Sequence, residues 1–168
     1  MSPFANLIIL DNTCINIFYL AGKLEKMLTL WPFHVFVVPG RVVNEAQAWP
    51  IHGDNVIRIL MKLREQNMID IVSINEESET ETEAYKQLRL AGPFLGAGES
   101  ECMAIAYCRG FIVASDDSVA RQRCKEVLPS VETITTGQIL NMARSDGLLT
   151  KTEVDEMWRL FQLRRNIS

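Results

Sequence analysis

Acidic side chains follow or interrupt short apolar runs at four separate places along the chain. Asp11 ends "IILD", Asp116 and Asp117 end "FIVASDD", Glu45 lies in "VVNEAQ", and Glu99 lies in "GAGESE" at the start of an apolar segment. Charged side chains are almost never fully buried unless something pairs with them. Carboxylates beside apolar segments therefore need an explanation.

If these acids meet at one place, they repel one another and their pKa values rise. A divalent cation is the usual resolution of such repulsion. A site with oxygen ligands and no histidine or thiolate suits Mg²⁺ or Mn²⁺ better than zinc. The commonest use of such a site is phosphate chemistry, in which the cation neutralises phosphate and activates a water molecule.

Taken singly, each acid also has an ordinary explanation. Asp11 and Asp116 are well placed to be helix N-caps. Glu45 could be a solvated side chain on an exposed helix face, and Glu99 could be a first-turn acid that the helix dipole favours. The argument for a site therefore depends on the acids occurring together.

The elements that must position these acids alternate between strand-like and helix-like segments. Apolar strands separated by helices predict an α/β fold, a three-layer α/β/α arrangement with a five-stranded, mostly parallel sheet. The carboxyl ends of such strands share one edge, where active sites gather. The predicted strands are residues 6–10, 33–38, 69–74, 111–115 and 131–135.

Length and composition set the remaining limits. With 168 residues, of which 48% are hydrophobic, the chain predicts a single domain spanning 1–168, with residues 136–165 as C-terminal helices. The net charge of −4 argues against a general nucleic-acid coat. No apolar stretch is long enough to span a bilayer, and the four cysteines form no C-x-x-C pair, so we expect a cytoplasmic protein without a membrane segment.

Several other chemistries find no support. The chain has no G-x-x-x-x-G-K-[ST] loop and no G-x-S-x-G elbow. Its only histidines, His34 and His52, share no ligand-like spacing with a cysteine, which argues against zinc. Thr13 stands two residues after Asp11, where a haloacid-dehalogenase-like phosphatase would carry a second aspartate.

In their order and spacing, the segments "IILDNT", "VVNEAQ" and "GAGESECMAIAYCRGFIVASDD" resemble the PIN-domain ribonucleases. Among these they are most similar to the VapC-like toxins of bacterial and archaeal toxin–antitoxin pairs. The resemblance covers nearly the whole chain. It implies a five-stranded parallel sheet between helices and Mg²⁺- or Mn²⁺-dependent hydrolysis of RNA phosphodiester bonds.

The resemblance also implies roles for individual residues. Asp11, Glu45 and Glu99 match the family's first three acids, with Asp11 and Glu99 as direct metal ligands. The fourth acid follows a strand that ends in Ser or Thr, which here gives Ser115 and Asp117.

Three further positions are less settled. Asp116, the neighbour of Asp117, either joins the metal ligands or caps the next helix. Thr13 matches a polar position that orients the first acid. Glu101 points about 200° away from Glu99 around the helix, at about 100° per residue, so we expect it at the surface or behind the ligands.

Substrate and partners follow from the same resemblance. Arg121 and Arg123 are candidates to hold flanking RNA phosphates, with Arg41 a weaker one, although all three could equally be solvated. The family implies a homodimer and an antitoxin partner. Apolar residues in 14–31 are candidates for that surface, and burial in the core is an equal alternative; they are Ile17, Phe18, Leu20, Leu24, Met27, Leu28 and Trp31.

Two other functions stay open at this stage. A PIN-like fold could bind RNA or a protein without cutting it, although the four acids count against this. A metal-dependent phosphatase would share the sheet and the acids but would turn over a small phosphomonoester.

Overall fold

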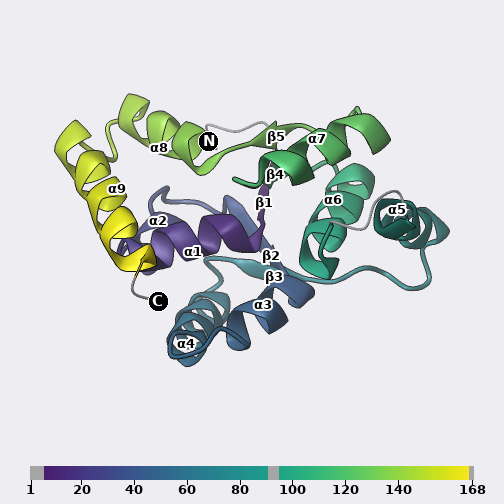
Figure 1. Ribbon diagram of the computed structural model, residues 1–168, viewed down its shortest axis with the longest axis horizontal. Coiled ribbons are helices and arrows are strands. Elements are labelled where there is room, and N and C mark those ends of the chain that lie inside the picture. The colour runs from purple at the N-terminus through teal and green to yellow at the C-terminus, as the bar shows by residue number, and fades with distance from the viewer. Residues whose placement is uncertain (1–5, 91–94, 167–168) are drawn as a thin grey trace.

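Short parallel strands form the central sheet of the computed structural model, which describes residues 6–90 and 95–166 (Figure 1). The sheet has five strands in the order β3-β2-β1-β4-β5, and every neighbouring pair is parallel. The predicted α/β fold with a five-stranded parallel sheet is therefore confirmed. The strands are β1 (Ile8–Leu10), β2 (Phe36–Pro39), β3 (Asp70–Val72), β4 (Ile112–Ala114) and β5 (Thr133–Ile134).

The strands are shorter than predicted, and many of the residues that fall outside them lie at their beginnings. Ile8, Ile9 and Leu10 in β1 are fully buried, as expected for a sheet covered on both faces. Ser115 was expected inside the fourth strand but lies just beyond it. Pro39 was expected to follow the second strand but is its last residue, paired with Val72, and the next helix begins immediately afterwards. Proline is tolerated there because it ends the strand and need not donate further along the ladder.

Helices join these strands and cover the sheet. Because such crossovers are right-handed, the helices that follow β1 and β2 lie on one face, and those that follow β3 and β4 lie on the other. α6 packs on β1, β2 and β4. The helices are α1 (Asn12–Leu20), α2 (Leu24–Leu28), α3 (Gly40–Gln47), α4 (Gly53–Glu65), α5 (Glu79–Leu90), α6 (Ala97–Arg109), α7 (Ser118–Val127), α8 (Thr136–Ser145) and α9 (Lys151–Arg165).

The topological switch point of the sheet lies between β1 and β4. The chain moves from β1 outward to β2 and β3, then returns to β4 on the other side of β1 and continues to β5. Open parallel sheets have a crevice at this point, beyond the carboxyl ends of the two central strands. Asp11 follows β1 and Asp116 and Asp117 follow β4, so the fold brings both segments to that crevice.

The apolar residues of 14–31 are buried in the core, so the predicted exposed partner surface is wrong for them. Phe18 and Met27 are 0% exposed and Trp31 is 3% exposed. The physical reason is that α9 packs against α1 (Figure 1). In addition, α4 packs against α2. The alternative that these helices serve the core is confirmed.

The C-terminal helices are α8 and α9, close to the predicted bounds of 136–165. A capping box begins α9: the backbone N–H of Glu153 donates to Thr150 Oγ1 at 3.1 Å, and the Glu153 carboxylate accepts from the Thr150 N–H. No helix in the described part of the chain is long and apolar enough to cross a bilayer.

Glu81 is a buried acid in the first turn of α5. Its carboxylate accepts hydrogen bonds from Arg109 Nε at 2.8 Å and from the Asn75 N–H at 2.8 Å. Arg109 also donates to the carbonyl of Ser73 at 2.7 Å. Glu81 therefore ties the connection between β3 and α5 to the end of α6.

We predict that Glu81→Ala lowers the free energy of unfolding by about 2 kcal/mol, because it leaves Arg109 and the Asn75 N–H without their acceptor; the figure is reduced for the partial exposure of Arg109. Urea unfolding at pH 7 measures this. Glu83→Ala, on the exposed side of the same helix, is the control and should change little. Equal effects of the two substitutions would contradict the role given to Glu81.

Candidate active site

Asp11 is a carboxylate held almost out of contact with water, with 2% of its surface exposed. It is the N-cap of α1, and Oδ1 accepts from the Asn12 N–H at 2.6 Å. Oδ2 accepts from Ser115 Oγ at 2.8 Å and from Thr13 Oγ1 at 3.3 Å. Burial raises the pKa of Asp11, the charge of Glu45 adds to this, and the three donors oppose it.

Glu99 lies in the first turn of α6 and faces Asp11 and Asp117. Its Oε2 accepts from the Gly96 N–H at 3.2 Å, which fixes the carboxylate at the start of the helix. Burial raises the pKa of Glu99 to about 7, and the charges of Asp11 and Asp117 contribute. The charges of Asp11 and Asp117, the first and fourth predicted acids, thus help to raise the pKa of Glu99, the third.

Asp117 is joined to Asp11 through one hydroxyl group. Ser115 Oγ donates to Asp11 and accepts from the Asp117 N–H at 3.2 Å. Asp117 is also the N-cap of α7, where its Oδ1 accepts from the N–H groups of Val119 at 2.9 Å and Ala120 at 3.1 Å. Ser115 and Thr13 both donate to the Asp11 carboxylate, and the contact of Ser115 was not part of the prediction.

Glu45 reaches across from α3 to the beginning of α6. Its Oε1 accepts from the Gly98 N–H at 2.9 Å. A Cβ atom at residue 98 would lie 2.7 Å from both carboxylate oxygens of Glu45, so any larger residue there would displace that carboxylate from its present position. This contact between Glu45 and Gly98 was not evident in the sequence.

Asp116 points to a different partner from the other acids. Its carboxylate accepts from the Thr136 N–H at 3.2 Å and from the Thr136 hydroxyl, both at the start of α8. The buried thiol of Cys14 also donates to it at 3.3 Å. Burial raises the pKa of Cys14 well above its usual range, so this sulfur is a neutral donor and not a thiolate. Thr136 and Cys14 are neighbours of the site that sequence reasoning missed, since each looks like an ordinary helix residue.

The arginines have more partners than the sequence suggested. Arg121 Nη1 donates to the Ser115 carbonyl at 2.9 Å, so it supports the end of β4. Arg123 pairs with Glu126 at 3.4 Å. Arg41 pairs with Glu101 at 3.1 Å and lies over the ring of Tyr85.

Glu101 is buried, with 3% of its surface exposed, so the expectation that it could be a surface residue is wrong. It accepts from both the backbone N–H and Nε of Arg41 at 3.0 and 3.1 Å. The reason is tertiary: α3 packs against the side of α6 that carries Glu101. Nothing in the local sequence signals this contact.

The donor set fits a hard divalent cation. Among residues 6–90 and 95–166, no group of three or more His, Cys, Asp or Glu side chains is arranged to hold a metal ion as it stands. Asp11, Glu99 and Asp117 are nevertheless close enough to affect the pKa of Glu99. All their ligand atoms are carboxylate oxygens, which Mg²⁺ and Mn²⁺ prefer.

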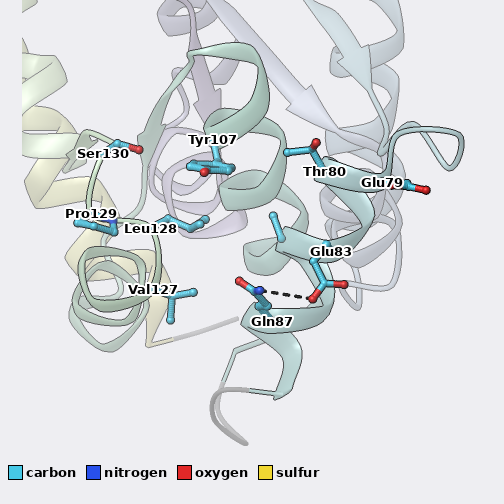
Figure 2. A pocket seen from close by; sticks show the side chains of 10 residues that line it. Glu79, Thr80, Glu83, Gln87, Tyr107, Val127, Leu128, Pro129 and Ser130 are labelled. Atoms are coloured by element: carbon cyan, nitrogen blue, oxygen red, sulfur yellow. Dashed lines mark hydrogen bonds between the residues drawn. The ribbon is translucent and has the colours of Figure 1, made fainter.

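The surface has another hollow that does not include these acids. This cavity has a volume of about 570 Å³. Its lining includes Glu83 and Gln87 of α5, Tyr107 of α6 and Leu128 after α7 (Figure 2). Glu83 and Gln87 hydrogen-bond to each other there at 3.4 Å. No acid from a strand end lines it, so we place the candidate active site at the crevice beside β1 and β4.

The fold and the acid cluster together define an α/β protein with several carboxylates gathered at the switch point of a parallel sheet. A family model described as "PIN domain" matches residues 7–164, and the chain belongs to this family. No curated protein sequence matches the chain.

Two solved structures are similar in fold. A PilT N-terminus domain protein from the hyperthermophilic archaeon Sulfolobus solfataricus is 13% identical, with 80% of this chain and 91% of that chain covered and a TM-score of 0.47. FitAcB from Neisseria gonorrhoeae is 16% identical, with 78% of this chain and 99% of that chain covered and a TM-score of 0.48.

We predict that Glu99→Gln stabilises the metal-free protein at pH 8, by about 1–2 kcal/mol after discounting for solvent screening. The folded protein keeps a proton on Glu99 up to about pH 7, whereas the unfolded chain releases it near its ordinary value of 4.5. Stability contributed by this group therefore falls as pH rises through that window. The glutamine side chain of the variant still accepts from the Gly96 N–H, so the helix cap is kept.

Thermal melting in EDTA at pH 5 and pH 8 measures this difference, which should be largest at pH 8 and nearly absent at pH 5. Glu153→Gln is a matched control, because Glu153 is also a capping-box glutamate, but its pKa is lowered by Lys26. It should not stabilise the protein at pH 8. A stabilisation by Glu99→Gln that is the same at both pH values would contradict the repulsion among the acids.

Proposed function

We propose that this chain is a metal-dependent ribonuclease that hydrolyses phosphodiester bonds of RNA with Mg²⁺ or Mn²⁺. The observation that carries the proposal is the electrostatic coupling of Glu99 to Asp11 and Asp117 at the switch point of the sheet. Membership of the PIN domain family supports it, because PIN domains are generally nucleases that use divalent metal ions.

We assign Asp11 and Glu99 as the direct ligands of the cation, with Asp117 and Glu45 completing the site. When bound, the cation neutralises the scissile phosphate and lowers the pKa of a coordinated water molecule. Ser115 and Thr13 hold the Asp11 carboxylate in one orientation by donating to its Oδ2. Arg121 supports Ser115 through its carbonyl.

Few positively charged side chains near the carboxylates are available to bind the phosphates of the RNA backbone. Arg123 is the remaining candidate for a flanking phosphate, and it would have to exchange its ion pair with Glu126 for that contact. Phosphate binding therefore depends on the cation more than on side chains of this chain.

We further propose that the nuclease is the toxin of a toxin–antitoxin pair in the cytoplasm, with a homodimer and an antitoxin protein as its assemblies. The resemblance of the acid-bearing segments to VapC-like toxins supports this. Growth arrest when the chain is expressed alone, relieved by the product of an adjacent small reading frame, is the expected result. Growth that is unaffected by expression of an active nuclease would contradict the toxin role.

We predict that Asp11→Asn lowers the cleavage of single-stranded RNA in Mn²⁺ at least about 100-fold, because it removes the charge of a metal ligand. Asn still has a side-chain oxygen to accept from the Asn12 N–H, so the fold should persist. A panel of end-labelled RNAs measures cleavage. Asp54→Asn, an exposed acid in the first turn of α4, is the control and should cleave normally.

The alternatives give different results in this assay. An RNA- or protein-binding module without activity predicts no metal-dependent cleavage by the unaltered protein. A phosphatase predicts turnover of a small phosphomonoester instead. Equal activity of Asp11→Asn and the unaltered protein would contradict the assignment of Asp11.

We predict that Asp116→Asn mainly lowers the stability of the protein, whereas Asp117→Asn mainly lowers its cleavage activity. Asp116→Asn weakens the contacts to Thr136 and should lower the free energy of unfolding by about 1–2 kcal/mol with little change in cleavage by the folded protein. Asp117→Asn should lower cleavage at least about 10-fold. If Asp116→Asn abolishes cleavage and Asp117→Asn does not, Asp116 is the fourth acid.

A further inference from the structure

A second recess adjoins the acid cluster and has a different character. It is a groove of about 490 Å³ between α1, the turn after α3, and α9. Ile17 and Leu20 of α1 form its apolar floor, and Trp49 and Phe161 line it with aromatic rings. Asp117 lines one part of it and Arg165 another, so the groove is continuous with the candidate active site. Its volume is within the range of small-ligand pockets.

The aromatic rings of the groove are held in place by neighbouring side chains. The ring of Trp49 contacts the ring of Tyr19 edge-on at a centroid distance of 5.6 Å and the ring of His52 in a tilted arrangement at 4.7 Å. The guanidinium of Arg165 lies 5.7 Å from the centre of the Phe161 ring. A held aromatic face beside an arginine is the arrangement that stacks the bases of single-stranded nucleic acid, since every base presents a π-face.

The negative charges that line the groove favour the base of a nucleotide over its phosphate. Asp116 and Asp117 line the groove, and their negative charge opposes a phosphate there. A neutral base avoids that repulsion. Asn16 also lines the groove, and its Oδ1 is a buried acceptor without a hydrogen-bond partner among the described residues. An unsatisfied amide oxygen of this kind suits the amino and imino groups at a base edge.

We propose that this groove binds the base of a nucleotide next to the scissile phosphate by stacking it against Trp49 and Phe161. The inference rests on the proposed ribonuclease function and adds a subsite that selects unpaired RNA, because a base can enter the groove only when it is not in a helix. The shared residue Asp117 connects the two sites, which favours a segment of the substrate over an unrelated protein chain as the occupant.

The test compares pairs of substitutions that separate an aromatic ring from mere apolar bulk. Phe161→Leu and Trp49→Leu remove the ring, whereas Phe161→Tyr and Trp49→Phe keep one. For a single-stranded RNA oligonucleotide in Mn²⁺, each leucine variant should raise KM about 10-fold with a smaller change in kcat. The aromatic variants should stay close to the unaltered protein. Leu163→Ala, at an exposed position of the same helix, is the control.

Binding is measured separately from cleavage in the Asp11→Asn background. A fluorescently labelled oligonucleotide is titrated with protein, and its anisotropy gives Kd. The leucine variants should weaken binding about 10-fold, and melting curves confirm that they are folded. A duplex of the same sequence should bind equally weakly to all variants.

The outcomes distinguish this inference from the function on which it rests. If the unaltered protein cleaves RNA but the leucine variants keep its KM and Kd, the stacking subsite is wrong and the groove serves another ligand, such as a protein segment. If the oligonucleotide binds in a ring-dependent way but no variant or unaltered protein cleaves RNA, the subsite stands and the nuclease is wrong. Equal loss in the leucine and aromatic variants overturns stacking as the mode of binding.

Discussion

A single negative charge, that of the Asp11 carboxylate, is the constraint on which the rest of the site depends. Asp11 is 2% exposed and lies at the topological switch point of the sheet, between β1 and β4. A buried carboxylate is costly unless donors surround it. Here the donors come from α1 and from the segment after β4, so the pairing of β1 with β4 is needed to bring them together.

The remaining acids are placed by contacts between helices. α3 and α6 are joined twice, by Glu45 with the Gly98 N–H and by Glu101 with Arg41. These links fix the first turn of α6, which carries Glu99 toward Asp11. The carboxylates repel one another in this arrangement, because Glu99 is held near Asp11 and Asp117. Such local destabilisation is the usual counterpart of a site built to hold a cation.

The sequence was informative about strands and strand ends and much less so about contacts between distant segments. Asp11 and Asp117 could be proposed because acids after apolar strands must meet at one edge of a parallel sheet, and Glu99 because it begins the apolar helix that leads into one of those strands. The difference between Asp116 and Asp117 could not, because it depends on the start of α8, about 20 residues further on. Glu101 was misjudged for the same reason, because its partner Arg41 comes from another element. The burial of Glu81 likewise depends on a partner from another element, Arg109.

The C-terminal helices matter to the site as well as to the core. α9 packs against α1 and thereby buries the residues that the sequence offered as a partner surface. The same helix contributes Phe161 and Arg165 to the groove beside the acids. Because α1 begins at Asp11 and also supplies the floor of that groove, one helix links the carboxylates to the aromatic rings. A shift of α9 along α1 would therefore change the groove while leaving Asp11 and Glu99 in place, so under the proposed function the selection of the substrate can vary independently of the chemistry.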